Sequence, residues 1–122
     1  MNAAPARARP VDPRCEVADL VQLSITRALG RRVRYKYVHP RVEALTLEGQ
    51  PGWKIVSPNC SRHIDPAGGP IDIAWLVQDG QRRWAVHARD HLRGDWRAMA
   101  DGLSLEAALA CVCADPLRVY WP

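Results

Sequence analysis

Phenylalanine is absent from this 122-residue chain, methionine occurs twice and cysteine four times. So few cysteines exclude a small disulfide-stapled scaffold, and 8 glycines with 10 prolines exclude a collagen-like chain. No apolar run approaches the ~20 residues that a membrane-spanning helix needs, so we expect no membrane partner. The remainder, with 48% hydrophobic and 25% charged residues, is typical of one globular domain.

Arginine outnumbers lysine by 15 to 2, and the net charge is +4. The arginine excess has two explanations: GC-rich coding bias, or selection for bidentate contacts with carboxylate and phosphate groups. The N-terminus lacks the apolar stretch of a secretory signal, and four cysteines without such a signal indicate a reducing compartment. We therefore expect a cytoplasmic protein.

Prolines and glycines divide the chain. Residues 1–11 are rich in Pro, Ala and Arg and are expected to form a disordered tail, whereas residues 12–122 should form one domain. Apolar residues at helical spacing predict a first helix from Pro13 to Leu29. A second amphipathic helix should begin after Ser104, a good N-cap residue, and end before Asp115-Pro116.

Alternating apolar and polar residues predict the strands. They are expected over residues 31–37, 42–47, 53–56, 71–77, 84–88 and 94–99, with a terminal apolar strand over 117–121 docked into the sheet. Short, turn-like connections such as Asp79-Gly80 favour antiparallel pairing. The sequence thus predicts a two-layer α+β fold: a mostly antiparallel sheet of five to six strands, with an N-terminal and a C-terminal amphipathic helix.

Two pairs of side chains have the spacing of metal ligands. Cys60 and His63 form a C-x-x-H doublet, and His87 and His91 belong to an H-x-x-D-H run. Zinc requires four ligands at about 2.0–2.3 Å, so the loop that carries Cys60 would have to fold over the end of the strand that carries His87. The alternative is that these are loop histidines without a metal.

The same residues could be drawn as a catalytic site. Cys60 with His63, or Ser57 or Ser61 with a histidine and Asp65 or Asp90, would pair a nucleophile with a base. No G-x-S-x-G elbow is present, and Gly68-Gly69 is followed by Pro70, which has no N–H to bind a phosphate. We therefore expect no catalytic activity.

Arginines interleaved with tryptophans form the leading candidate site. Three basic residues alternate along one predicted strand, and other arginines flank Trp84 and Trp96. Guanidinium groups beside aromatic rings bind single strands or nucleotides by phosphate contact and base stacking. The residues expected to carry such binding are Arg32, Arg34, Lys36, Arg83, Trp96 and Arg97. The alternative is that the tryptophans fill the core in place of phenylalanine and the arginines only solvate the sheet edges.

Residues 20–38, a predicted helix that ends in the run from Leu29 to Tyr37, resemble the opening of the WYL domain, a bacterial regulatory module, and residues 84–90 and 94–97 resemble its later strands. That resemblance implies an SH3-like domain that senses nucleic acid or nucleotides, with Arg97 in the place of a ligand-contacting arginine. Ala85 and Val86 stand where the WYL domain has Tyr and Leu, and no helix-turn-helix precedes the domain.

A second likeness covers residues 70–122. The strand 84–86, Trp96, the Ser104–Leu109 helix start and the ending Val119-Tyr120-Trp121-Pro122 resemble short bacterial proteins of a domain-of-unknown-function family. This likeness accounts for the C-terminal helix and implies no activity. The sequence therefore favours a bacterial non-catalytic binding or regulatory module for nucleic acid or nucleotides. The alternatives are a protein-interaction adaptor, such as an immunity or accessory protein, and a small zinc protein.

Overall fold

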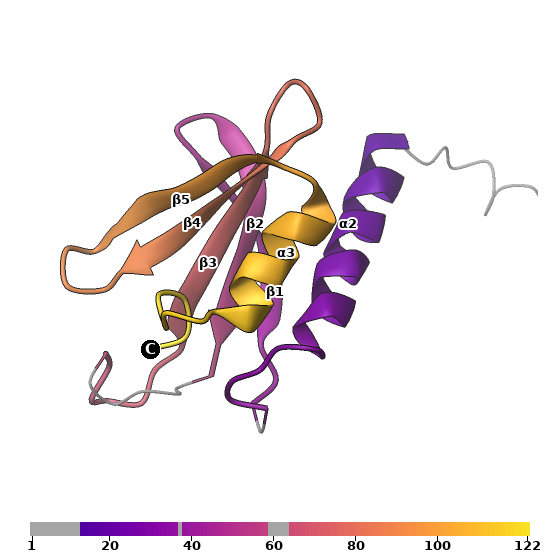
Figure 1. Ribbon diagram of the computed structural model, residues 1–122. Helices are drawn as coiled ribbons and strands as arrows, with labels where there is room; N and C mark the ends of the chain where they lie inside the picture. Colours follow the sequence, from indigo (N-terminus) through magenta and orange to yellow (C-terminus); the bar gives the residue numbers. More distant parts are fainter. Residues whose placement is uncertain (1–12, 37, 59–63) are drawn as a thin grey trace, which may run out of the picture.

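A computed structural model of the chain describes residues 13–36, 38–58 and 64–122 (Figure 1). The elements in chain order are α2 (Pro13–Leu29), β1 (Arg41–Leu47), β2 (Gln50–Ser57), β3 (Ile71–Gln78), β4 (Trp84–Asp90), β5 (Asp95–Leu103) and α3 (Leu105–Ala114). The five strands form an antiparallel sheet in the order β1-β2-β3-β4-β5. The predicted α+β class is confirmed, with both helices where the apolar stripes placed them.

Both helices cover the same face of the sheet (Figure 1). The core lies between the two layers, where Ile25 and Leu29 of α2 and Val112 of α3 meet strand residues such as Ile55 and Leu76. Ser104 caps α3 as predicted, because its side chain accepts a hydrogen bond from the Ala107 N–H at 3.0 Å. Within the described residues, no helix covers the opposite face of the sheet, which is termed the open face below.

The strand predicted over residues 31–37 is wrong for residues 31–36, which form turns and bends; Tyr37 lies outside the described residues. The alternation is inverted there, because Arg32 is buried whereas the Val33 side chain is 64% exposed. The Val33 N–H donates to the carbonyl of Cys113 at 2.9 Å. This segment therefore ties the end of α2 to α3 and does not extend the sheet.

The terminal strand predicted over residues 117–121 is also wrong, since these residues form turns and bends. Trp121 is nevertheless fully buried. The carboxylate of Asp115, itself buried in a left-handed conformation, accepts hydrogen bonds from the N–H groups of Val119, Tyr120 and Trp121 at 2.7–3.3 Å. The indole of Trp121 donates to the Val112 carbonyl at 3.0 Å. Hydrogen bonds to the Asp115 carboxylate thus take the place of the strand pairing that the apolar pattern predicted.

All five strands are longer than predicted, β2 and β5 by the most. β2 begins at Gln50, so the connection between the strands predicted over 42–47 and 53–56 shortens to a tight turn, with Glu48 and Gly49 at φ values of 51° and 79°. β5 extends to Leu103, with register shifts against β4. Such bulges bend a strand and increase its twist.

Trp75 shapes the open face. Its indole donates to the Leu45 carbonyl at 3.0 Å, although β2 separates β3 from β1. A Cβ added at Gly52 would lie 2.6 Å from the indole nitrogen. The ring therefore crosses the sheet over the one β2 residue without a side chain, and Trp75 is only 4% exposed.

Candidate functional site

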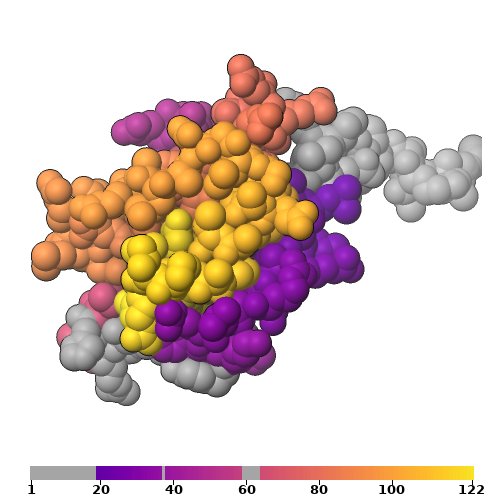
Figure 2. All heavy atoms as spheres, viewed as in Figure 1, coloured from indigo at the N-terminus to yellow at the C-terminus, as the bar shows by residue number. Residues whose placement is uncertain are grey.

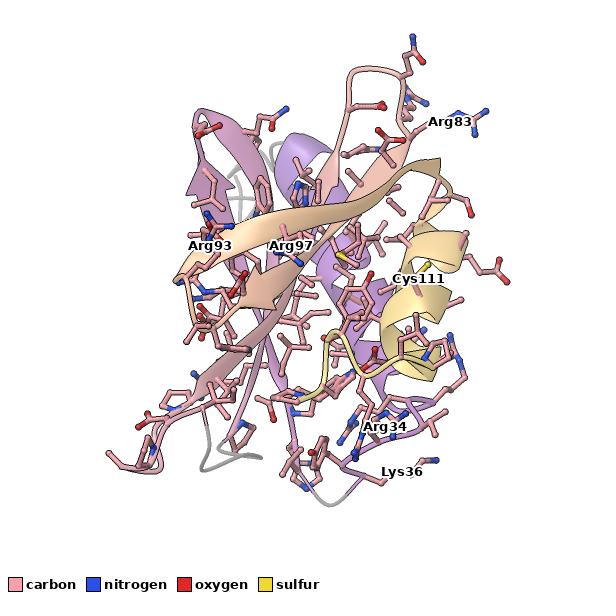
Figure 3. All side chains as sticks on the ribbon, turned by 60° about the vertical axis from the view of Figure 1, so that its left-hand side comes forward. Arg34, Lys36, Arg83, Arg93, Arg97 and Cys111 are labelled. Carbon is pink, nitrogen blue, oxygen red and sulfur yellow. The ribbon has the colours of Figure 1, made fainter. Side chains whose placement is uncertain are left out.

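The predicted binding residues fall in three separate places (Figure 3). Arg83 is exposed at the turn between β3 and β4, where its guanidinium donates to the Gly102 carbonyl at 3.2 Å. Arg34 and Lys36 belong to the segment after α2. Trp96 and Arg97 lie on β5. The six residues named from the sequence therefore do not form one surface.

Arg32 is not available to a ligand, because its side chain is only 5% exposed. Its guanidinium donates to the Leu29 carbonyl at 2.8 Å, to that of Tyr35 at 2.6 Å and to that of Val38. It also lies 5.4 Å from the ring centroid of Trp121. Burial lowers its pKa from the ordinary value. Arg32 thus belongs to the interior and corrects the expectation of a phosphate-binding residue.

Arg34 is half-buried and donates to the Asp115 carbonyl through Nε at 3.4 Å and Nη2 at 3.2 Å. Lys36 beside it is exposed. Arg34 thus holds the end of α3, and Lys36 is the one residue of this pair that is open to solvent.

Trp96, at the third place, lies among residues that the binding prediction did not include. The Arg89 guanidinium lies 5.0 Å from the centroid of the Trp96 ring, a cation–π distance. The two residues face each other across β4 and β5. On the neighbouring pair of strands, the rings of His87 and Trp75 lie 4.9 Å apart. Strand alternation places all four side chains on the open face.

The charges on the open face are partly balanced. Asp72 accepts an ion pair from Lys54 at 3.2 Å, and the Arg89 Nε lies 3.9 Å from its other oxygen. Asp72 therefore holds Arg89 from one side while Trp96 contacts it from another. The Arg89 side chain is 24% exposed, so it stays partly accessible to solvent.

A hollow of about 460 Å³ opens on this surface. We term it the open-face hollow; its lining residues are Leu47, Glu48, Gln50, Trp75, His87, Arg89, Gly94, Asp95 and Trp96. The volume lies within the range of small-molecule sites, roughly 300–1,000 Å³. Its wall thus offers aromatic rings, one guanidinium and two carboxylates.

The β4–β5 hairpin adds cations beside the hollow. Asp90 accepts the Arg93 N–H at 3.0 Å and an ion pair from Arg97 at 3.4 Å. The Arg93 backbone bond, followed by the charge of Arg97, lowers the pKa of the Asp90 carboxyl. Figure 3 shows the Arg93 and Arg97 side chains at this end of the sheet.

The chain matches one protein family over most of its length. The family described as Domain of unknown function (DUF3024) matches residues 13–122. The chain belongs to this family. The resemblance to short domain-of-unknown-function proteins is confirmed, and the match extends beyond the expected residues 70–122. No curated protein and no solved structure matches the chain. These findings show no link between the DUF3024 chain and the WYL domain.

The metal prediction for this DUF3024 domain is tested only in part. Cys60 and His63 lie outside the described residues. His87 lines the open-face hollow, whereas His91 lines a different hollow, and burial followed by the Arg89 charge lowers the pKa of His91. Over residues 13–36, 38–58 and 64–122, no three His, Cys, Asp or Glu side chains converge as metal ligands.

The remaining sequence candidates of the DUF3024 domain are also placed. Ser57 is fully buried and its hydroxyl donates to the Pro58 carbonyl at 2.8 Å, while Ser61 lies outside the described residues. Neither of the described helices has the length and apolar character needed to cross a membrane.

Arg89, His87 and Trp75 are the site residues that the binding prediction missed. The signal was present: residues 87 and 89 alternate on one strand, and the four-residue turn 91–94 brings Arg89 opposite Trp96. Sequence proximity had instead favoured Arg97, which lies beside Trp96 in the chain but on the other side of the strand.

Proposed function

We propose that this protein is a non-catalytic module that binds a nucleotide or single-stranded nucleic acid in the open-face hollow. The observation that carries the proposal is the Arg89–Trp96 pair at the wall of a hollow of about 460 Å³. Aromatic rings on a sheet surface accept stacked bases, and a guanidinium beside them contacts phosphate.

The charges around the hollow favour a nucleotide or a short strand over a long polyanion. Glu48 and Asp95 line the wall with Arg89. Carboxylates repel phosphates but accept hydrogen bonds from the amino groups of bases, as acidic side chains do from cytosine. Phosphate contacts then fall to Arg89 and to Arg93 in the adjoining turn, because the Arg97 side chain lies on the other side of β5. A base inside the hollow with its phosphate toward the hairpin satisfies both sets of charges.

Fluorescence anisotropy of a labelled, mixed-sequence single-stranded oligonucleotide tests the proposal, with nucleoside monophosphates as competitors. Saturable binding should weaken as salt rises, because phosphate contacts release counterions. Trp96→Ala should weaken binding roughly fivefold to 150-fold, the equivalent of 1–3 kcal/mol for one stacked base. Trp96→Phe should retain most of the affinity.

Two exposed basic residues away from the hollow supply matched controls. Arg83→Ala and Lys36→Ala remove the same charge as Arg89→Ala, but from the β3–β4 turn and from the segment after α2. Only Arg89→Ala should weaken binding markedly. Equal losses in all three variants would indicate contact with the net charge of the protein and would contradict a site in the hollow.

A protein-interaction adaptor is the second candidate function. A different hollow of about 390 Å³ is lined by Leu92, Met99 and Val119 among others, and the Leu92 side chain is 97% exposed. Exposed apolar surface of this kind marks protein contacts. Absence of saturable oligonucleotide and mononucleotide binding at low salt would favour this alternative.

A further inference from the structure

We propose that two copies of this chain associate through the groove between α2 and α3. The groove lies on the helical side of the molecule, so the dimer would leave both open faces accessible. It has a volume of about 450 Å³ and is termed the helix groove. Its lining residues are Ser24, Ala28, Arg31, Leu105, Glu106, Leu109, Ala110 and Cys113.

The two helices run in the same direction along the groove. The Cys113 thiol donates to the Ala28 carbonyl at 3.2 Å, which places the C-terminal ends of α2 and α3 together. Both N-terminal ends lie toward the top of Figure 1, and atoms of the two helices adjoin on the face seen in Figure 2. The groove therefore has two distinct ends.

Opposite charges occupy these two ends. Arg31 follows the C-terminus of α2, near Cys113, whereas Glu106 lies in the first turn of α3. Seven residues separate Glu106 from Cys113, which is about 10 Å along a helix. Both side chains are exposed, and neither forms an ion pair with another residue in the described part of the chain.

This arrangement is complementary to itself. A two-fold axis through the middle of the groove exchanges its ends, so Glu106 would meet the partner subunit's Arg31 while Arg31 meets the partner subunit's Glu106. The small side chains of Ser24 and Ala110 between them allow close approach of the backbones. A second copy therefore matches the charge order of the groove.

The same association would cover exposed apolar side chains of α2. Leu20 lies one helical turn before Ser24 on the same stripe and is 63% exposed. Leu23, beside it, is 44% exposed. Their burial would supply apolar contact area next to the two reciprocal ion pairs.

Sedimentation velocity over a range of protein concentrations tests the proposal. Wild-type protein should approach twice its 13.6 kDa mass as concentration rises. Glu106→Arg and Arg31→Glu should each raise the dimer dissociation constant by roughly tenfold or more, because each places two like charges in contact twice. The double variant Arg31→Glu/Glu106→Arg should restore dimerisation, and its recovery would show that both substitutions are compatible with folding.

Leu20→Asp should also give a monomer, whereas Leu92→Asp, at the far larger exposure of 97%, should leave the dimer unchanged. A wild-type protein that stays monomeric at all concentrations would overturn the proposal. So would a dimer that withstands both charge reversals and dissociates only in Leu92→Asp. Because Trp96 and Arg89 lie on the opposite face, oligonucleotide binding by the monomeric variants reports separately on the proposed function.

Discussion

At the scale of single residues, Arg32 shows why a charge pattern does not by itself locate a surface. The last carbonyls of a helix have no partner within the helix, and a guanidinium can satisfy several of them at once. Arg32 does so for Leu29 at the end of α2 and then for Tyr35 and Val38. Its neighbours Arg31 and Arg34 carry the same charge in the same run, so no local signal distinguished it.

We predict that Arg32→Lys lowers the free energy of unfolding by about 2 kcal/mol. An ammonium group cannot donate in a fork to three carbonyls or lie flat beside Trp121. Urea unfolding followed by circular dichroism measures the effect, with Lys36→Ala as the exposed control. Equal midpoints for Arg32→Lys and wild type would contradict a structural role for the guanidinium.

Among the predicted binding residues, Trp96 remains in the proposed site because its side chain is only half-buried in the structure. Arg89 entered the site only through pairing between two strands, which places it opposite Trp96. Trp96 could be identified from the sequence because a tryptophan among arginines is chemically distinctive. Arg89 could not, because its place beside Trp96 depends on the register between β4 and β5. Arginine is too frequent in this chain for its type alone to mark a site.

At the scale of elements, the central strands could be predicted and the flanking segments could not. Apolar residues on both faces of β3 are typical of a central strand, and β3 is the middle strand of the sheet. Segments 31–36 and 117–121 also alternate, but each forms hydrogen bonds with residues at the end of α3. The conformation of these two segments depends on hydrogen bonds of Arg32 and Asp115, and the tertiary structure decides which groups form those bonds.

Gly52 also shows that the role of a residue depends on the element in which it lies. The sequence placed it in a turn, and the structure places it within β2 beneath the Trp75 ring. A Cβ there would also lie 2.6 Å from the Leu76 carbonyl oxygen, which cannot move without shifting β3. The absence of a side chain is thus required by the close approach of the Trp75 indole and the Leu76 carbonyl.

We predict that Gly52→Ala lowers the free energy of unfolding by about 2 kcal/mol, within the range for overpacked sites. Gly80→Ala is the matched control, because nothing lies within 4 Å of the added Cβ and its φ is not positive. That variant should stay within about 0.5 kcal/mol of wild type. Thermal unfolding of both variants gives the comparison, and equal melting temperatures would contradict the predicted clash.

At the scale of the whole molecule, stability should depend on alkaline pH through Tyr120. Burial, followed by the charges of Cys111 and Asp115, raises the pKa of Tyr120 to about 12. An unfolded tyrosine ionises near pH 10. The folded state therefore holds its proton over a range in which the unfolded state has lost it. The corresponding stability is complete below about pH 10 and is lost as pH rises toward 12.

We predict that the free energy of unfolding falls by up to about 3 kcal/mol between pH 10 and pH 12 because of this group. Tyr120→Phe removes the hydroxyl and should flatten that part of the pH profile while leaving neutral-pH stability nearly unchanged. Urea titrations at half-unit steps of pH give the slope. An unchanged slope in Tyr120→Phe would assign the alkaline loss of stability to other groups.

The bond between the Cys113 thiol and the Ala28 carbonyl joins positions 85 residues apart, and Trp121 packs near the same helix end. During synthesis, at roughly 5–20 residues per second, α2 would leave the ribosome about 4–17 s before its partner segment. α2 and the sheet can assemble in that interval, yet the part of the core that α3 covers stays open. Nascent chains stalled before residue 113 would therefore expose the apolar side chains that contact α3 in the folded protein.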